Sequence, residues 1–171
     1  IGQYDKAIEY LKKALEISRQ IGEKRSEGIN LGNKGIVYQE LGKYEKSLSL
    51  FKDSIEIFKQ IGNKKNEGIF LGNVGDLSLK LERWKEAEQY LSEAIDICES
   101  INYPAHHAFR GSLAFVTAIL GNVEKALSLI EYSDNKYSYM FFPVVRLFKK
   151  NYLFEIGYNG NDSFLSFMTH F

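Results

Sequence analysis

Hydrophobic positions along the chain recur every three or four residues, in stretches that short polar segments separate. The stretch near residue 50 shows the spacing clearly, with apolar residues at Tyr44, Leu48, Phe51, Ile55 and Phe58. This spacing puts apolar side chains on one face of a helix. The whole pattern predicts helices at about residues 4–21, 24–41, 44–61, 64–81, 84–101, 104–120 and 123–132.

The pattern itself repeats after forty residues. Leu31-Gly32-Asn33 returns as Leu71-Gly72-Asn73, and a third copy follows after thirty-nine residues, where Leu120 corresponds to Leu81. Each period holds two predicted helices, and one helix pair cannot bury its apolar face alone. We therefore predict an all-α fold in which antiparallel helix pairs stack into a solenoid.

Small residues recur where neighbouring helices should meet. Gly35 and Gly75 are equivalent positions in the first helix of each pair, and a larger side chain there would clash with the next helix. Gly22 and Gly62 follow the second helices, where a glycine in the left-handed conformation commonly ends a helix. These glycines predict both close packing and the places where the helices end.

One run of residues resembles the tetratricopeptide repeat. It consists of Gly35, Tyr38, Leu41-Gly42, Tyr44 and Phe51, with Ser47 and Ser54 where the family usually has alanine. The forty-residue period and the Leu-Gly-Asn motif resemble the long-repeat subclass of the LGN/Pins family and its bacterial relatives. The resemblance covers residues 1–132 and implies a right-handed α-solenoid that acts as a protein–protein interaction scaffold.

The first residues fall in the middle of a repeat. Ile1-Gly2-Gln3-Tyr4 matches Leu41-Gly42-Lys43-Tyr44, so the first helix should be the second member of a pair. We expect the first helix of that pair, and further repeats, to lie upstream.

The repeat pattern fades over residues 133–171. Half of the 24 aromatic residues fall in the last forty positions. We predict that this segment is a degenerate fourth helix pair, with helices at about 144–156 and 163–171, because terminal repeats are often atypical caps. The alternative is an interaction segment or homodimer contact, since Tyr137, Tyr139, Met140, Phe141 and Phe142 form a dense apolar run.

Composition and charge argue against several functions. The 22 basic and 22 acidic residues cancel, whereas nucleic-acid-binding proteins usually carry a basic excess. No apolar stretch approaches the ~20 residues that a membrane-spanning helix needs. The single cysteine, Cys98, excludes an internal disulfide framework and fits a reducing compartment, so we expect a cytoplasmic protein that binds neither nucleic acid nor membrane.

Catalytic motifs are also absent from the sequence. There is no phosphate-binding loop, nucleophile elbow or zinc-protease motif. His106 and His107 are adjacent, and neighbouring helical side chains point about 100° apart, which suits two partly exposed residues better than a shared metal. Cys98 falls on the predicted buried side of its helix. We expect no catalytic residue, no metal site, no cofactor and no enzymatic activity.

The resemblance places the binding surface on the first helices, which line a concave groove in tetratricopeptide arrays. The residues that helical spacing assigns to this lining are Arg25, Ile29, Asn33, Ile36, Glu40, Lys65, Ile69, Asn73, Asp76, Lys80, Ala108, Ser112, Phe115 and Ile119. Asn33 and Asn73 occupy the position where the resembled family presents an asparagine ladder to an extended peptide. The alternative is that they only bridge neighbouring helices. Gly32, Gly72 and Gly111 are expected to keep the groove wall low.

Basic residues in the first turn of these helices suggest the character of the partner. Arg25 and Lys65, beside Lys24 and Lys64, stand where the helix dipole disfavours cations, which either reflects an acidic partner or solvated side chains. The leading hypothesis is a scaffold for an acidic-apolar peptide. A regulatory or sensor module of a larger signalling or transcription protein is the first alternative. A self-oligomerising array, joined through the N-terminal helix or the aromatic C-terminal segment, is the second.

Overall fold

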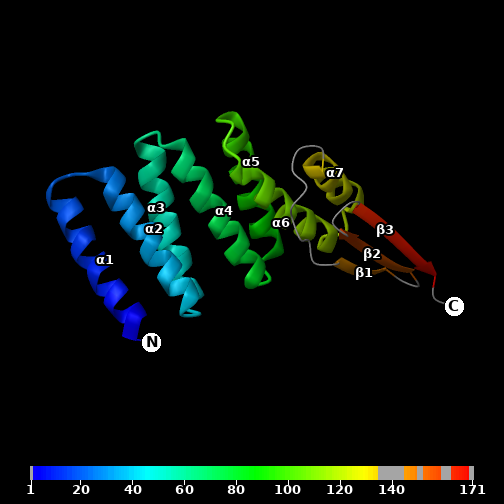
Figure 1. Cartoon of the computed structure of the whole chain (residues 1–171), viewed down its shortest axis with the longest axis horizontal. Helices are drawn as coiled ribbons and strands as arrows, with labels where there is room; N and C mark the ends of the chain where they lie inside the picture. The colour runs from blue at the N-terminus through cyan, green and yellow to red at the C-terminus, as the bar shows by residue number, and fades with distance from the viewer. Residues whose placement is uncertain (1, 135–144, 150–151, 159–162, 170–171) are drawn as a thin grey trace. The chain divides into compact units, whose positions relative to one another are not determined.

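The computed structural model describes residues 2–134, 145–149, 152–158 and 163–169, and side-chain burial up to residue 129. All seven predicted helices are present in these ranges, each within two residues of its predicted ends (Figure 1). They are α1 (Gly2–Gln20), α2 (Lys24–Glu40), α3 (Tyr44–Gln60), α4 (Lys64–Lys80), α5 (Trp84–Ser100), α6 (Ala105–Ile119) and α7 (Val123–Asp134). The predicted helical architecture is confirmed for residues 2–134.

The chain forms two compact units, the first ending at His106 and the second beginning at His107. In the first unit each helix packs against the next one along the chain, from α1 to α5, and successive helices run in opposite directions (Figure 1). This arrangement is the stack of antiparallel pairs that the repeat predicts.

Helix ends in the first unit follow the predicted glycines. Gly22, Gly42 and Gly62 adopt φ values of +70°, +69° and +67°, which a residue without a Cβ tolerates best. The backbone N–H of the following residue then donates to a carbonyl in the last turn, as in the 2.9 Å bond from Glu23 N to Ser18 O. The turn after α4 reaches the same conformation with Glu82 at φ 57°.

Close approach between helices occurs at the predicted glycines. A Cβ built on Gly35 would lie 2.6 Å from the Phe51 ring, and one built on Gly75 would lie 2.6 Å from Leu91 Cγ. Both partners are fully buried, so any side chain at these glycines would displace the core. The predicted role of these two glycines in packing is confirmed.

The C-terminal part of the second unit is a sheet and not the predicted fourth helix pair. Strands β1 (Val145–Lys149), β2 (Tyr152–Tyr158) and β3 (Ser163–Thr169) form an antiparallel sheet in the order β1-β2-β3. Lys149 pairs with Tyr152 between β1 and β2, and Tyr158 pairs with Ser163 between β2 and β3. The helices predicted at 144–156 and 163–171 are therefore wrong.

The sequence of β2 explains this error. Tyr152, Phe154, Ile156 and Tyr158 occupy every second position, which is the period of a strand, and aromatic and β-branched residues favour strands. Gly157, which directly follows the helix predicted at 144–156, lies within the strand. The aromatic run at 137–142 lies outside the described residues, so its proposed interaction role stays a prediction.

Candidate functional site

Helices α2 and α4, the first helices of successive pairs, meet at Gly32 and Phe70. A Cβ built on Gly32 would lie 2.1 Å from Phe70 Cζ, so the phenyl ring occupies the space above this glycine. Gly32 is buried. It does not keep a groove wall low, as the sequence suggested, but allows a large side chain of α4 to pack on α2. Asn33 and Ile69, the sequence neighbours of these two residues, are brought to the same junction.

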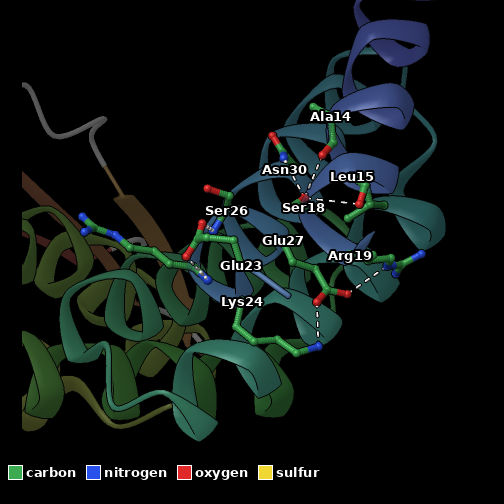
Figure 2. A network of polar contacts seen from close by, with 10 residues as sticks. Ala14, Leu15, Ser18, Arg19, Glu23, Lys24, Ser26, Glu27 and Asn30 are labelled. Atoms are coloured by element: carbon green, nitrogen blue, oxygen red, sulfur yellow. Dashed lines mark hydrogen bonds and ion pairs between the residues drawn. The ribbon is translucent and has the colours of Figure 1, made fainter. Parts of the chain in front are cut away.

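Asn33 and Asn73 differ from Asn30 and Asn63 in the way their carboxamides are used. Asn33 is exposed and Asn73 is half-buried. Within the described part of the chain, neither carboxamide forms a hydrogen bond to another residue. Asn30, by contrast, donates to Ser18 Oγ at 3.4 Å (Figure 2), and Asn63 caps α4. The bridging role considered for Asn33 and Asn73 therefore has no hydrogen bond to support it.

The predicted neighbours of the two asparagines are accessible to different degrees. On α2, Ile36 is 41% exposed and Ile29 is half-buried, which leaves apolar surface beside Asn33. The residues Ile69 and Asp76 of α4 are half-buried, while Glu40 and Lys80 are exposed near the C-terminal ends of their helices. The α2/α4 face, defined by Asn33, Ile36, Asn73 and these neighbours, thus combines apolar surface, amides and both signs of charge.

The lysines of the first helical turn are explained by two buried glutamates. Lys24 Nζ lies 2.7 Å from Glu27 Oε2, and Lys64 Nζ lies 2.9 Å from Glu67 Oε2. The glutamate side chains are only 8% and 3% exposed. A carboxylate in the first turn interacts favourably with the helix dipole. Each lysine also neutralises the carboxylate, whose burial as an unpaired charge would cost free energy. These two lysines therefore serve the fold.

Glu27 has a second partner that ties α1 to α2. Arg19 Nε, near the end of α1, lies 2.9 Å from Glu27 Oε1 (Figure 2). The hydrogen bonds from Lys24 and then from Arg19 lower the pKa of Glu27 below its ordinary value. The sequence carries a signal for this cluster, because Lys-x-x-Glu-Gly occurs at both 24–28 and 64–68, but the pattern alone does not reveal that the glutamates are buried.

The remaining first-turn cations differ from each other. Lys65 Nζ lies 4.8 Å from the centroid of the Tyr103 ring, a distance at which an ammonium is attracted to the aromatic face. Arg25 is exposed, and its backbone N–H donates to Glu23 Oε1. Lys24, Lys64 and Lys65 thus have partners within the protein. The exposed Arg25 also acts on a neighbour, since hydrogen bonds from Ser26 and the charge of Arg25 lower the pKa of Glu23.

Ser112 and Phe115, the third part of the predicted lining, belong to α6 and to the second unit. There Ser112 and Ile119 are half-buried, Ala108 is exposed and Phe115 is 36% exposed. Since they belong to a different unit from α2 and α4, the site is built from the first unit alone.

Groups that could perform chemistry are held in structural roles. The Cys98 thiol is buried, and burial raises its pKa, which confirms the prediction of a core residue. His106 Nδ1 lies 2.8 Å from the Tyr103 carbonyl oxygen, while His107 is buried and not partly exposed as predicted, because it falls on the apolar side of α6. The described residues contain no group of histidines, cysteines and carboxylates that could hold a metal ion. No helix among them is long and apolar enough to cross a membrane.

Solved structures with this fold are numerous, and three illustrate the likeness. BtubC from P. vanneervenii is 18% identical with a TM-score of 0.70, over 87% of this chain and 65% of that one. The apo form of RapI is 23% identical with a TM-score of 0.73, over 78% and 49% of the two chains. A Rap protein complexed with Competence and Sporulation Factor is 22% identical with a TM-score of 0.70, over 78% and 37%.

These identities establish the fold alone, and the chain spans less than two thirds of each of the three structures. No curated protein sequence matches the chain. The family model described as tetratricopeptide repeat matches residues 1–60 and 27–100, which together cover 1–100 of the 171 residues. With its forty-residue helix pairs and packing glycines in place, the chain belongs to the tetratricopeptide repeat family.

Proposed function

We propose that this protein is a non-enzymatic scaffold that binds an extended peptide along the α2/α4 face. The observation that carries the proposal is the pair of asparagines on successive first helices, whose carboxamides form no hydrogen bond within the described residues. A carboxamide both donates and accepts, so it can pair with the N–H and C=O of a peptide bond whatever the side chain. Two such groups, one on each helix, would hold a backbone in an extended conformation.

The surroundings of the asparagines suggest the side chains of this peptide. Ile36 is exposed and Ile29 and Ile69 are half-buried, so apolar side chains of the ligand would bury further surface here. Arg25, exposed at the start of α2, would attract an acidic residue at one end. We therefore propose a mainly apolar peptide with an acidic group facing Arg25, which is a narrower statement than a generally acidic ligand.

Two further points support this function. A structurally similar Rap protein has been solved in complex with Competence and Sporulation Factor, so the same fold can hold a bound factor. The long repeat with Leu-Gly-Asn also resembles the LGN/Pins subclass, and the proposal takes Asn33 and Asn73 as the equivalents of its asparagine ladder. We propose a cytoplasmic location, because the single thiol is unpaired and suits a reducing compartment.

The proposal can be tested with a displayed random-peptide library. Peptides selected on the wild-type protein would be titrated against Asn33→Ala/Asn73→Ala and against Asn30→Ala as a matched control. Loss of several hydrogen bonds to the peptide backbone should weaken binding by the double variant at least about tenfold. The Asn30 variant loses only an internal hydrogen bond and should retain its affinity. Equal binding by the double variant, with an unchanged helical circular dichroism spectrum, would disprove the proposal.

A further inference from the structure

Ion pairs connect helices α3 and α5 in a network of alternating charge. Lys52 Nζ of α3 lies 3.0 Å from Glu86 Oε1 of α5 and 5.4 Å from the centroid of the Tyr90 ring. Arg83, at the N-cap of α5, lies 4.0 Å from Glu86 and also forms an ion pair with Glu45 of α3. Two carboxylates and two cations thus neutralise each other where these helices meet.

The same four positions occur forty residues earlier, in α1 and α3, with a different balance of charge. The residues that keep the sign of charge are Asp5 for Glu45, Lys12 for Lys52 and Lys43 for Arg83. Glu86, however, corresponds to Lys46, and Tyr90 corresponds to Leu50. With three lysines against one aspartate, the earlier set carries an excess of two positive charges, whereas the later set is neutral.

The two sets of positions should have the same geometry, because the helices around them pack in the same way. A Cβ built on Gly35 would lie 2.6 Å from a side chain of α3, and one built on the equivalent Gly75 would lie 2.6 Å from a side chain of α5. Residues 18 and 30 meet between α1 and α2, as residues 58 and 70 do between α3 and α4. We therefore expect Lys12 to lie beside Lys46, as Lys52 lies beside Glu86.

The Tyr38 ring brings two of the three lysines to one place. Lys43 Nζ lies 5.9 Å and Lys46 Nζ 5.8 Å from the centroid of this ring. Lys46 stands in the first turn of α3, where the helix dipole disfavours a cation. Within the part of the chain that the structure describes, Lys12, Lys43 and Lys46 form no ion pair. An anion beside these three residues, which we term the lysine cluster, would relieve their mutual repulsion.

Acidic residues near the lysine cluster limit the size of the anion. Asp5 and Glu9 belong to α1, Glu45 belongs to the first turn of α3, and all three are exposed. A long polyanion such as nucleic acid would meet these carboxylates, and the whole chain has no basic excess. One or two acidic side chains of a protein would meet only the lysines, as the single carboxylate of Glu86 does beside Lys52.

We propose that the lysine cluster binds acidic side chains of a partner protein. One carboxylate of the partner lies between Lys12 and Lys46 and takes the role that Glu86 has between α3 and α5. A second carboxylate lies beside Lys43. The cluster belongs to α1 and α3, so the proposal does not depend on peptide binding to the α2/α4 face.

A fluorescein-labelled peptide of six glutamates serves as the acidic probe for the full chain. Fluorescence anisotropy at low salt should show binding that Lys46→Glu weakens at least about tenfold, because an attraction becomes a repulsion. Lys85→Glu is the matched control, since it makes the same change of net charge at an exposed residue in the first turn of α5. This control should retain the wild-type affinity. Lys46→Glu should also keep or raise the urea midpoint, because it recreates the ion pair of Lys52 with Glu86.

Four results would overturn the proposal. The first is equal affinity of Lys46→Glu and the wild type for hexaglutamate. The second is an equal loss in Lys85→Glu, which would show dependence on net charge alone. The third is Lys46-dependent binding of a ten-nucleotide oligothymidine that is tighter than binding of hexaglutamate, which would assign the cluster to nucleic acid. The fourth is a urea midpoint of Lys46→Glu below that of Lys85→Glu, which would contradict the equivalence of the two sets of positions.

Discussion

The Phe58 and Phe70 rings stack in parallel, with centroids 5.7 Å apart and an interplanar angle of 1°. The equivalent positions forty residues earlier are Ser18 and Asn30, which meet through a hydrogen bond of 3.4 Å (Figure 2). The same junction between a second helix and the following first helix is thus aromatic in one repeat and polar in the other. This difference predicts unequal contributions to stability.

Phe70→Ala should destabilise the protein far more than Asn30→Ala. Phe70 contacts both Phe58 and Phe51, and truncating a buried phenylalanine costs about 3 to 5 kcal/mol. The loss of one long hydrogen bond at Asn30 should cost about 1 kcal/mol. Urea unfolding monitored by circular dichroism measures both, and similar losses from the two variants would contradict this account of the junctions.

Gly32 and Phe70 should be energetically coupled. Gly32→Ala places a methyl group in the volume of the Phe70 ring and should cost about 1 to 3 kcal/mol. In a Phe70→Leu background the added methyl group should be tolerated better, so the double variant is more stable than the sum of the single effects predicts. A double-mutant cycle in urea measures this coupling. Purely additive effects would show that the ring does not occupy the space above Gly32.

Stability should fall on acidification in a way that depends on Glu27. The pKa of Glu27 is lowered in the folded protein by Lys24 and Arg19, so the carboxylate contributes stability above its unfolded pKa of about 4.3. This contribution is lost as the pH falls through the lower, folded value. Glu27→Gln should therefore lower the free energy of unfolding at pH 7. Between pH 7 and pH 3 the variant should lose less further stability than the wild type does.

The exposed Glu9 provides the control for this pH dependence. Its ion pair with Lys13 is open to solvent, and such pairs contribute little to stability. Urea midpoints of Glu9→Gln should follow those of the wild type from pH 7 to pH 3. If Glu27→Gln followed the wild type as closely, the buried cluster would not be the source of acid sensitivity.

Cys98 should be unreactive while the protein is folded. The thiol is buried and its pKa is raised by burial, so little thiolate is present at pH 8 and reagents cannot reach it. A colourimetric thiol reagent should label it at the rate of global unfolding, and at once in urea. A Cβ built on Gly68 of α4 would lie 2.7 Å from Cys98 Sγ, so rapid labelling of the native protein would mean that this close packing of α4 and α5 opens readily.

The extent to which the sequence predicts the structure differs along the chain. The helices of residues 2–134 follow from hydrophobic spacing, and the contacts at Gly35 and Gly75 follow from the repeat, because equivalent residues perform equivalent packing. The sheet after residue 144 has no counterpart in the repeat. Its aromatic residues alternate as in a strand, but the prediction extended the helical repeat into this segment. A periodic pattern constrains the residues that share it and says little about the segment that follows.

The candidate site was predictable in part, for a similar reason. Helical spacing identified Asn33, Asn73 and Ile36 as accessible, since exposure depends mainly on the helix face. It could not show that Lys24 and Lys64 pair with buried glutamates, because burial of a charged residue depends on the neighbouring helix. Gly32 was misinterpreted for the same reason, since its partner Phe70 is an asparagine in the preceding repeat.

The side-chain amide signals of the asparagines test the central claim most directly. In nitrogen–proton correlation spectra of the labelled full chain, each carboxamide gives a separate pair of signals that single alanine variants assign. Addition of a library-selected peptide should shift the pairs from Asn33 and Asn73 and leave the pair from Asn30 in place. Shifts at Asn30, or unmoved signals from Asn33 and Asn73 at saturating peptide, would contradict peptide binding on the α2/α4 face.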